Sequence, residues 1–114
     1  MIGKFKLYTI KQTEDTYPIE YLKNENKEVW FEEMSISDKL RFESEERKRK
    51  LSLKIRIQQM KEITAFNVVE IDGKFHKVFN AYHFTNNDGF KQTDLTLEEY
   101  PRVKMEDELC LKQN

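Results

Sequence analysis

Residues 51–58, with the sequence LSLKIRIQ, alternate apolar and polar side chains without a break. Successive side chains of a β-strand point to opposite faces. One face of this segment would carry Leu51, Leu53, Ile55 and Ile57. The alternation predicts a half-buried strand, and it requires a fold that contains a sheet.

Three further segments support a β-rich chain. Residues 4–11 (KFKLYTIK) alternate in the same way, and residues 27–34 (KEVWFEEM) are rich in strand-forming side chains around Trp30. A last strand would place Thr93, Leu95 and Leu97 on one face. We also expect a short edge strand at residues 18–22 and a loop at residues 24–26.

Two turn signals lie between the later strands. Asp72-Gly73 separates residues 67–71 from residues 75–82, and this dipeptide favours a type I′ hairpin turn. The run Asn86-Asn87-Asp88-Gly89 predicts a second turn before the last strand.

One segment, residues 35–50, predicts a helix. Ser35 or Ser37 is a suitable N-cap, and acidic residues precede basic ones at i,i+4 spacing, each pair worth about 0.2–0.5 kcal/mol. Its apolar side chains occur only in the first half, so the second half has no buried face within this chain. That half either lies in solvent or contacts another subunit.

These elements predict a mainly β fold, a small antiparallel β-barrel or sandwich with one helix inserted between the second and third main strands. The 114 residues suit one domain, residues 1–100, followed by a charged C-terminal tail, residues 101–114. The expected core consists of Trp30, Leu53, Ile55, Ile57, Val69, Ile71, Leu95 and Leu97.

Charge and cysteine content exclude several classes of function. Lys and Arg total 20 against 21 Asp and Glu, a balance that argues against a nucleic-acid-binding domain without excluding a local basic patch. Cys110 is the single cysteine, so we expect no intrachain disulfide, no cysteine metal site and a reducing compartment. No apolar run approaches the roughly 18 residues of a membrane span, and the start has no signal-peptide pattern, which predicts a soluble protein that is not exported.

Nothing in the sequence indicates an enzyme. Phosphate-binding, zinc-protease and serine-hydrolase motifs are absent, and His76 and His83 have no evident catalytic or ligand partners nearby. The adjacent glutamate pairs are more typical of a solvated surface. We therefore predict no catalytic residues, no metal and no cofactor. The basic run at residues 47–50 is either a salt-bridged helix end or a nucleic-acid contact.

The order of these features resembles the head–tail joining, or head-closure, proteins of long-tailed bacteriophages. The matching segments are EVWFEEM around Trp30, SISDKLRFESEE after it, LKIRI at residues 53–57, IDGKFHKVFNA around Gly73, and LTLEEY. Together they cover residues 4–100. The sequence departs from the family pattern at His76, where a tyrosine is frequent, and in its more strongly charged helix.

The resemblance implies a virion structural protein rather than an enzyme. Such proteins form rings, commonly dodecameric, under the portal and its adaptor, close the DNA-filled head and provide the docking surface for the tail. The implied partners are other copies of the chain, a portal-side adaptor and a tail-side completion protein. Packaged double-stranded DNA would pass through the channel without sequence-specific binding. A chain that is monomeric when free, assembled in the bacterial cytoplasm and located in the virion, is compatible with this role.

The resemblance also implies a functional segment, residues 35–50, that faces the channel or the next subunit. Its candidate residues are Ser35, Asp38, Arg41, Glu43, Glu45, Glu46, Arg47, Lys48, Arg49 and Lys50. The main alternative is a small OB-like nucleic-acid-binding module, in which Phe75 and Phe79 flank Lys77 as a stacking platform.

Overall fold

The computed structural model describes residues 2–35, 51–100 and 105. The strands are β1 (Ile2–Gln12), β2 (Glu20–Met34), β3 (Leu51–Gln58), β4 (Asn67–Ile71), β5 (Lys74–Thr85) and β6 (Lys91–Glu99). These ranges contain no helix, and thus none with the length and apolar character of a membrane span. The predicted mainly β class is confirmed.

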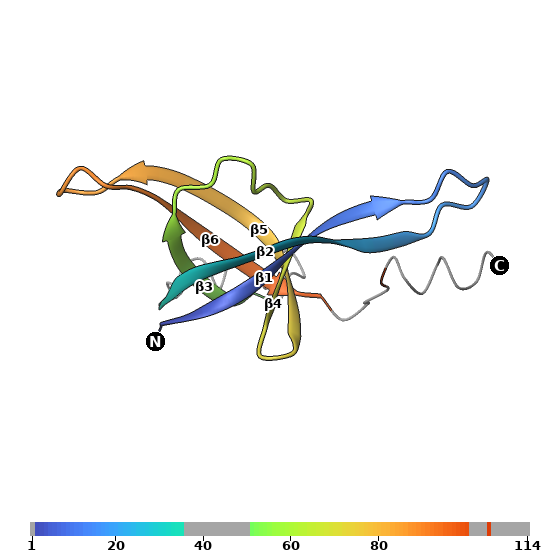
Figure 1. The fold of residues 1–114 in the computed structure, drawn as a ribbon, viewed down its shortest axis with the longest axis horizontal. Helices are drawn as coiled ribbons and strands as arrows, with labels where there is room; N and C mark the ends of the chain where they lie inside the picture. The colour runs from blue at the N-terminus through green and yellow to red at the C-terminus, as the bar shows by residue number, and fades with distance from the viewer. Residues whose placement is uncertain (1, 36–50, 101–104, 106–114) are drawn as a thin grey trace.

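The strands form one antiparallel sheet. The hydrogen-bonded order is β1-β2-β3-β6-β5-β4, and β4 pairs back to β1, which closes the sheet into a barrel. In Figure 1 the β1–β2 hairpin extends away from the barrel on one side and the β5–β6 hairpin on the other. Because the pairing closes on itself, the barrel presents no long free strand edge.

Two predicted features lie largely outside the described residues. The helix inserted between the second and third main strands would occupy residues 36–50, and the charged tail would occupy residues 101–114. Met105 is the one described residue of that tail, and it forms an isolated parallel bridge with Leu22.

The β1–β2 hairpin is longer than the barrel requires. β1 pairs with β4 only over residues 6–9, and β2 pairs with β3 only over residues 32–34. From residue 10 to residue 22, strand pairing within the described chain joins β1 to β2 alone, apart from the bridge to Met105. We call residues 10–22 the arm. It contributes to an elongated molecule of 53 × 33 × 24 Å.

The strand predicted at residues 27–34 is confirmed, but the predicted loop at residues 24–26 and the separate edge strand at residues 18–22 are wrong, because β2 is continuous from Glu20 to Met34. Lys6 pairs with Glu28 but Tyr8 pairs with Asn24, so β2 carries a bulge at this point. Asn26 takes a left-handed φ of 56°, and its backbone N–H donates to the Asn24 side chain at 2.8 Å. Asparagine tolerates this conformation, so the polar run forms a bulge inside a strand instead of a loop.

Both predicted turns are confirmed. Asp72 and Gly73 have φ values of 51° and 79°, the pair of positive angles that a type I′ turn needs, and Ile71 pairs with Lys74 across it. In the second turn the Asn86 side-chain oxygen accepts the backbone N–H of Asp88 and of Phe90, at 3.0 and 2.9 Å.

The barrel interior holds most of the predicted core. The buried members of the predicted set are Ile55, Ile57, Val69, Ile71, Leu95 and Leu97. Leu53 is half-buried and packs against this cluster. The structure adds Phe5, Leu7, Phe31, Ile63 and Val78 to the interior.

Trp30 was predicted to be buried, and this prediction is wrong: its side chain is 63% exposed. The next residue, Phe31, points inward instead and is 4% exposed. Phe31 pairs with Gly3, where an added Cβ would lie 3.1 Å from the Phe31 ring. The missing side chain at Gly3 leaves room for that ring. Phe31 therefore points into the barrel, and its neighbour Trp30 points to the outer face.

Candidate functional site

The segment predicted to be functional, residues 35–50, is described only at Ser35, which is exposed just beyond the end of β2. The charged residues of that prediction, at positions 38–50, lie outside the described part of the chain. The described surface instead brings together other side chains, on the outer face of the barrel and on the arm.

Residues paired across a sheet point to the same side, so the register defines the outer face. One row runs from Glu32 through Arg56 and Asp94 to Tyr82. Beside it, Lys4 pairs with Trp30, and Gln58 pairs with Gln92, which pairs with Phe84. Apart from Lys4 on β1, these residues follow β2, β3, β6 and β5 around half of the closed barrel, and Trp30 on β2 lies three strands away from Tyr82 on β5. We call this outward-facing band the outer aromatic face. Its members are Lys4, Trp30, Glu32, Arg56, Gln58, Tyr82, Phe84, Gln92 and Asp94.

The rings of the outer aromatic face lie beside cations. The Lys4 Nζ is 4.5 Å from the centroid of the Trp30 ring. The Arg56 guanidinium carbon is 5.0 Å from the centroid of Phe84, whose ring stacks on Tyr82 at 5.6 Å. Such cation–π contacts contribute about 0.5–1 kcal/mol at exposed sites. They orient the rings while leaving Trp30 and Tyr82 accessible, at 63% and 60% exposed.

Arg56 is also held by a two-pronged ion pair. Its Nε and Nη2 donate to the carboxylate oxygens of Asp94 at 2.7 and 3.0 Å. This hydrogen bonding raises the pKa of Arg56, against the opposing effect of burial. The guanidinium covers Asp94, which explains why an outward-facing carboxylate is only 7% exposed. The charge of Arg56 is therefore largely compensated within the chain.

The arm presents a different surface at its tip. The Thr13 backbone N–H donates to the Ile19 carbonyl at 3.0 Å, and the Ile19 N–H donates to the Thr13 hydroxyl oxygen at 2.9 Å. These bonds close the connecting loop. Within it Tyr17 is 85% exposed and Ile19 is 40% exposed. Glu14 and Asp15, in the same loop, are exposed carboxylates.

The base of the arm packs into a second apolar cluster outside the barrel interior. Leu22, Tyr8 and Val68 are buried there. The Tyr8 hydroxyl donates to Glu70 at 2.7 Å, and burial together with this bond raises the pKa of Tyr8 to about 12. The Tyr100 hydroxyl donates to Glu20 at 2.7 Å. The arm is thus fixed at its base, and among the described residues these contacts lie at the base and not at the tip.

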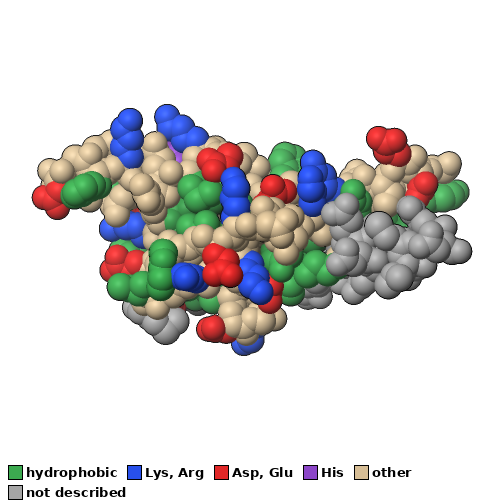
Figure 2. Space-filling view, in the orientation of Figure 1, with side chains coloured by type: hydrophobic (Ala, Val, Ile, Leu, Met, Phe, Trp, Pro, Cys, Tyr) green, Lys and Arg blue, Asp and Glu red, His purple; other side chains and the backbone are tan. Residues whose placement is uncertain are grey.

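Figure 2 shows the result on one side of the molecule. Hydrophobic side chains reach the surface at the end formed by the β5–β6 turn and again at the tip of the arm, with charged side chains between them. Exposed apolar side chains that form a contiguous patch are typical of interaction surfaces.

A cavity of about 760 Å³ lies beside the points where β2 ends and β3 begins. Ser52 and His76 line it, with their Oγ and Nδ1 atoms 2.8 Å apart. Burial, and then Lys74, lower the pKa of His76, while Glu99 opposes them, so the ring is neutral at pH 7. The Ser52 hydroxyl donates to the Leu97 carbonyl at 3.3 Å. The roles in the shorter Ser52–His76 hydrogen bond follow the tautomer of the imidazole, because either the hydroxyl or the ring N–H can be the donor.

The stacking platform predicted for the alternative function is not free. Phe75 is half-buried, 5.5 Å from the Tyr8 ring in the cluster at the arm base. Lys77 lies 4.0 Å from a Glu98 carboxylate oxygen, and Phe79 is half-buried. Within the described ranges, no group of three or more His, Cys, Asp or Glu side chains is arranged to hold a metal ion.

Sequence reasoning missed the outer aromatic face. The sequence pattern that could have revealed it is the set of polar positions between the apolar ones in the alternating strands, since Arg56 and Asp94 both occupy such positions.

The chain matches no protein-family model and no curated protein. The two surfaces described above and the sequence resemblance are the observations that bear on its function.

Proposed function

We propose that this chain is a structural subunit of a bacteriophage head–tail connector. It would form a ring with other copies beneath the portal and its adaptor, close the DNA-filled head and offer a docking surface to a tail-side protein. The protein would be assembled in the host cytoplasm and retained in the virion, with packaged DNA passing through the ring.

The observation that carries the proposal is the presence of exposed aromatic side chains at two separate places, the outer aromatic face of the barrel and the tip of the arm. A subunit of a closed ring contacts one neighbour with one surface and the other neighbour with a different surface. The arm tip and the outer aromatic face meet this requirement, since they differ in composition and lie in different parts of the molecule. Neither is needed to complete the barrel core.

The predicted segment at residues 35–50 belongs to the same proposal. Its acidic and basic halves would pair between neighbouring subunits or line the channel. Exposed ion pairs contribute only about 0–1 kcal/mol to folding, so these charges should matter for assembly more than for stability. Reversing Arg47, Lys48 and Arg49 together should leave the melting temperature within a few degrees of wild type but prevent head closure. Normal assembly with this triple variant would remove the segment from the functional site.

The proposal is tested in particles. A phage that lacks this protein should yield heads that package DNA but lose it, and that do not accept tails. Heads that retain DNA and join tails without the protein contradict the proposal. Electron microscopy of the particles and nuclease sensitivity of their DNA measure the two outcomes separately.

A nucleic-acid-binding module is the second candidate, because Trp30 beside Lys4 and Phe84 beside Arg56 could stack on bases. The OB fold is a five-stranded, partly open barrel, whereas this barrel has six strands and closes. The pairing of Arg56 with Asp94 also weakens the local positive field. Submicromolar, steeply salt-dependent binding of single-stranded DNA would favour this candidate over the connector.

A further inference from the structure

We infer that the arm tip of one copy of this chain binds the outer aromatic face of the next copy. This inference rests on the proposed ring assembly and names the contact that would build it. The occupant of the outer aromatic face is then a second copy of the same protein.

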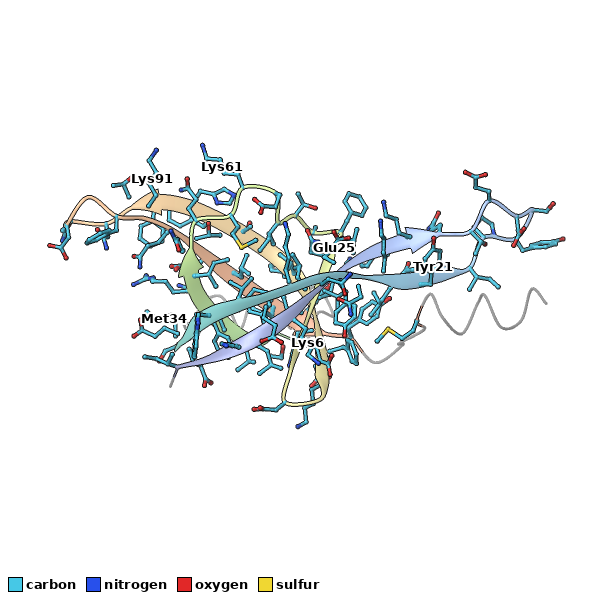
Figure 3. All side chains as sticks on the ribbon, viewed as in Figure 1. Lys6, Tyr21, Glu25, Met34, Lys61 and Lys91 are labelled. Carbon is cyan, nitrogen blue, oxygen red and sulfur yellow. The ribbon has the colours of Figure 1, made fainter. Side chains whose placement is uncertain are left out.

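The two surfaces cannot meet within one chain. Lys4 and Gln12 lie on the same strand of a continuous hairpin, and eight residues of strand span about 26 Å. Figure 3 shows the separation along β2, with Tyr21 on the arm and Met34 toward the opposite end of the strand. The arm base is fixed by Leu22, which is 1% exposed, so the arm does not fold back. A contact between the surfaces must join two copies.

The two surfaces are complementary in chemistry. The arm tip carries an exposed tyrosine, Tyr17, beside the carboxylates of Glu14 and Asp15. On β1 and β2 the outer aromatic face carries the exposed ring of Trp30 and the ammonium group of Lys4, positioned over that ring. Glu32 also lies on this face, and its charge adds to the hydrogen bond from Arg56 to Asp94, the main cause of the raised pKa of Arg56. Lys4 is consequently the cation best placed to meet the arm's carboxylates, with Trp30 beside it for the Tyr17 ring.

The contact is small, which predicts weak binding per contact. Large aromatic side chains bury about 150–250 Å² each, while a stable interface buries about 1,200–2,000 Å² in total. A few rings and one hairpin loop therefore fall at the low end of that range. Closing a ring strengthens weak contacts, because each subunit is held by two of them at once. We expect self-association of the free chain only at high micromolar concentration and above.

The contact uses a different surface on each partner, and this gives a decisive experiment. An arm variant, Tyr17→Ser with Ile19→Ser, keeps an intact outer aromatic face. A face variant, Trp30→Ser, keeps an intact arm. All of these side chains are exposed, so both variants should melt within a few degrees of wild type. Phe66→Ser is the matched control, because Phe66 is 70% exposed and belongs to neither surface.

Sedimentation velocity up to about 1 mM measures the association. Wild type and Phe66→Ser should grow beyond a dimer with concentration, and each surface variant alone should associate at least tenfold more weakly. An equimolar mixture of the two variants should form a dimer and stop there, because the remaining arm and face are both disabled.

Several results overturn the inference. One is self-association of the arm variant at the wild-type level, which a face-to-face dimer would give. Others are a mixture of the two variants that is no more associated than either variant alone, and a Phe66→Ser variant whose self-association is as weak as that of the surface variants. A wild-type chain that stays monomeric at 1 mM also overturns it. Each of these leaves the connector proposal standing, since that proposal is tested by DNA retention in particles. Conversely, the expected dimer together with heads that close normally without the protein would keep the contact and reject the connector.

Discussion

The barrel and the arm are built from the same two strands, but they are held in place by different numbers of neighbours. In the barrel, each strand has a hydrogen-bonded partner on both sides, and side chains such as Ile55 and Leu95 are completely buried. In the arm, β1 and β2 have mainly each other, and the tip exposes Tyr17 and Ile19. The barrel accounts for most of the buried core of the fold, whereas the arm has a packed base and a tip whose apolar groups are exposed.

Truncation in the barrel interior should have the largest effect. Ile55 is 0% exposed in the centre of β3, so Ile55→Ala should cost about 2–5 kcal/mol of unfolding free energy. The corresponding change at the arm tip, Ile19→Ala, should cost less than about 0.5 kcal/mol, because Ile19 is already 40% exposed. Urea denaturation followed by circular dichroism measures both. A loss below 1 kcal/mol for Ile55→Ala would show that this face of β3 does not form the core.

The arm base should respond less strongly than the barrel and more strongly than the arm tip. Leu22 is 1% exposed, but within the described ranges its cluster contains two other buried residues, Tyr8 and Val68. Leu22→Ala should therefore cost about 2 kcal/mol, the low end for a buried leucine. Hydrogen exchange should accelerate at residues 10–12 while the amides of β3 and β6 keep their protection. Equal acceleration in the barrel strands would show that arm and barrel unfold as one unit.

The barrel was more predictable from the sequence than the arm, for a physical reason. Alternation determines which side chains face inward once one face is buried, and residues 51–58 alternate without ambiguity. The Asp72-Gly73 turn follows from local backbone preferences. The arm depends on strand pairing beyond the barrel, and the bulge at Asn26 made its second strand look like two strands and a loop. Pairing between distant segments leaves no comparable local pattern.

The pH dependence of stability should differ between the barrel wall, which contains His76, and the arm tip. The lowered pKa of His76 means that the unfolded chain, with an imidazole pKa near 6.5, takes up a proton more readily than the folded chain. The contribution of this group is fully present above about pH 6.5 and is lost as the pH falls below that value. The melting temperature should drop over this range, and His76→Gln should reduce the drop. His83→Gln is the control and should keep it, since His76 remains.

This prediction would be contradicted if the melting temperature of His76→Gln fell with decreasing pH as steeply as that of wild type. The fall in stability below pH 6.5 would then come from other groups, and burial of His76 at the barrel wall would have no measurable electrostatic cost. Arm-tip variants such as Tyr17→Ser should follow the wild-type profile, because their side chains contact neither His76 nor Ser52 in the described structure.

A small effect is also expected at Trp30, and it tests why this residue was wrongly predicted to be buried. Val29, Trp30 and Phe31 are three consecutive apolar residues, so alternation alone does not decide which of them faces the core. Gly3 lies opposite Phe31, and its missing side chain leaves room for the Phe31 ring to point inward. Trp30→Ala should then cost no more than about 1 kcal/mol, mostly from the lost contact with Lys4.

Phe31→Ala, one position along the same strand, is the matched comparison and should cost about 3–5 kcal/mol. Denaturant titrations of the two variants side by side measure the difference. Similar losses for both would mean that Trp30 carries core stability after all and is not available to a partner. A near-neutral Trp30→Ala, combined with the weakened self-association expected of Trp30→Ser, would instead assign the ring to binding, because a side chain that does little for folding but much for assembly is positioned for a contact outside its own chain.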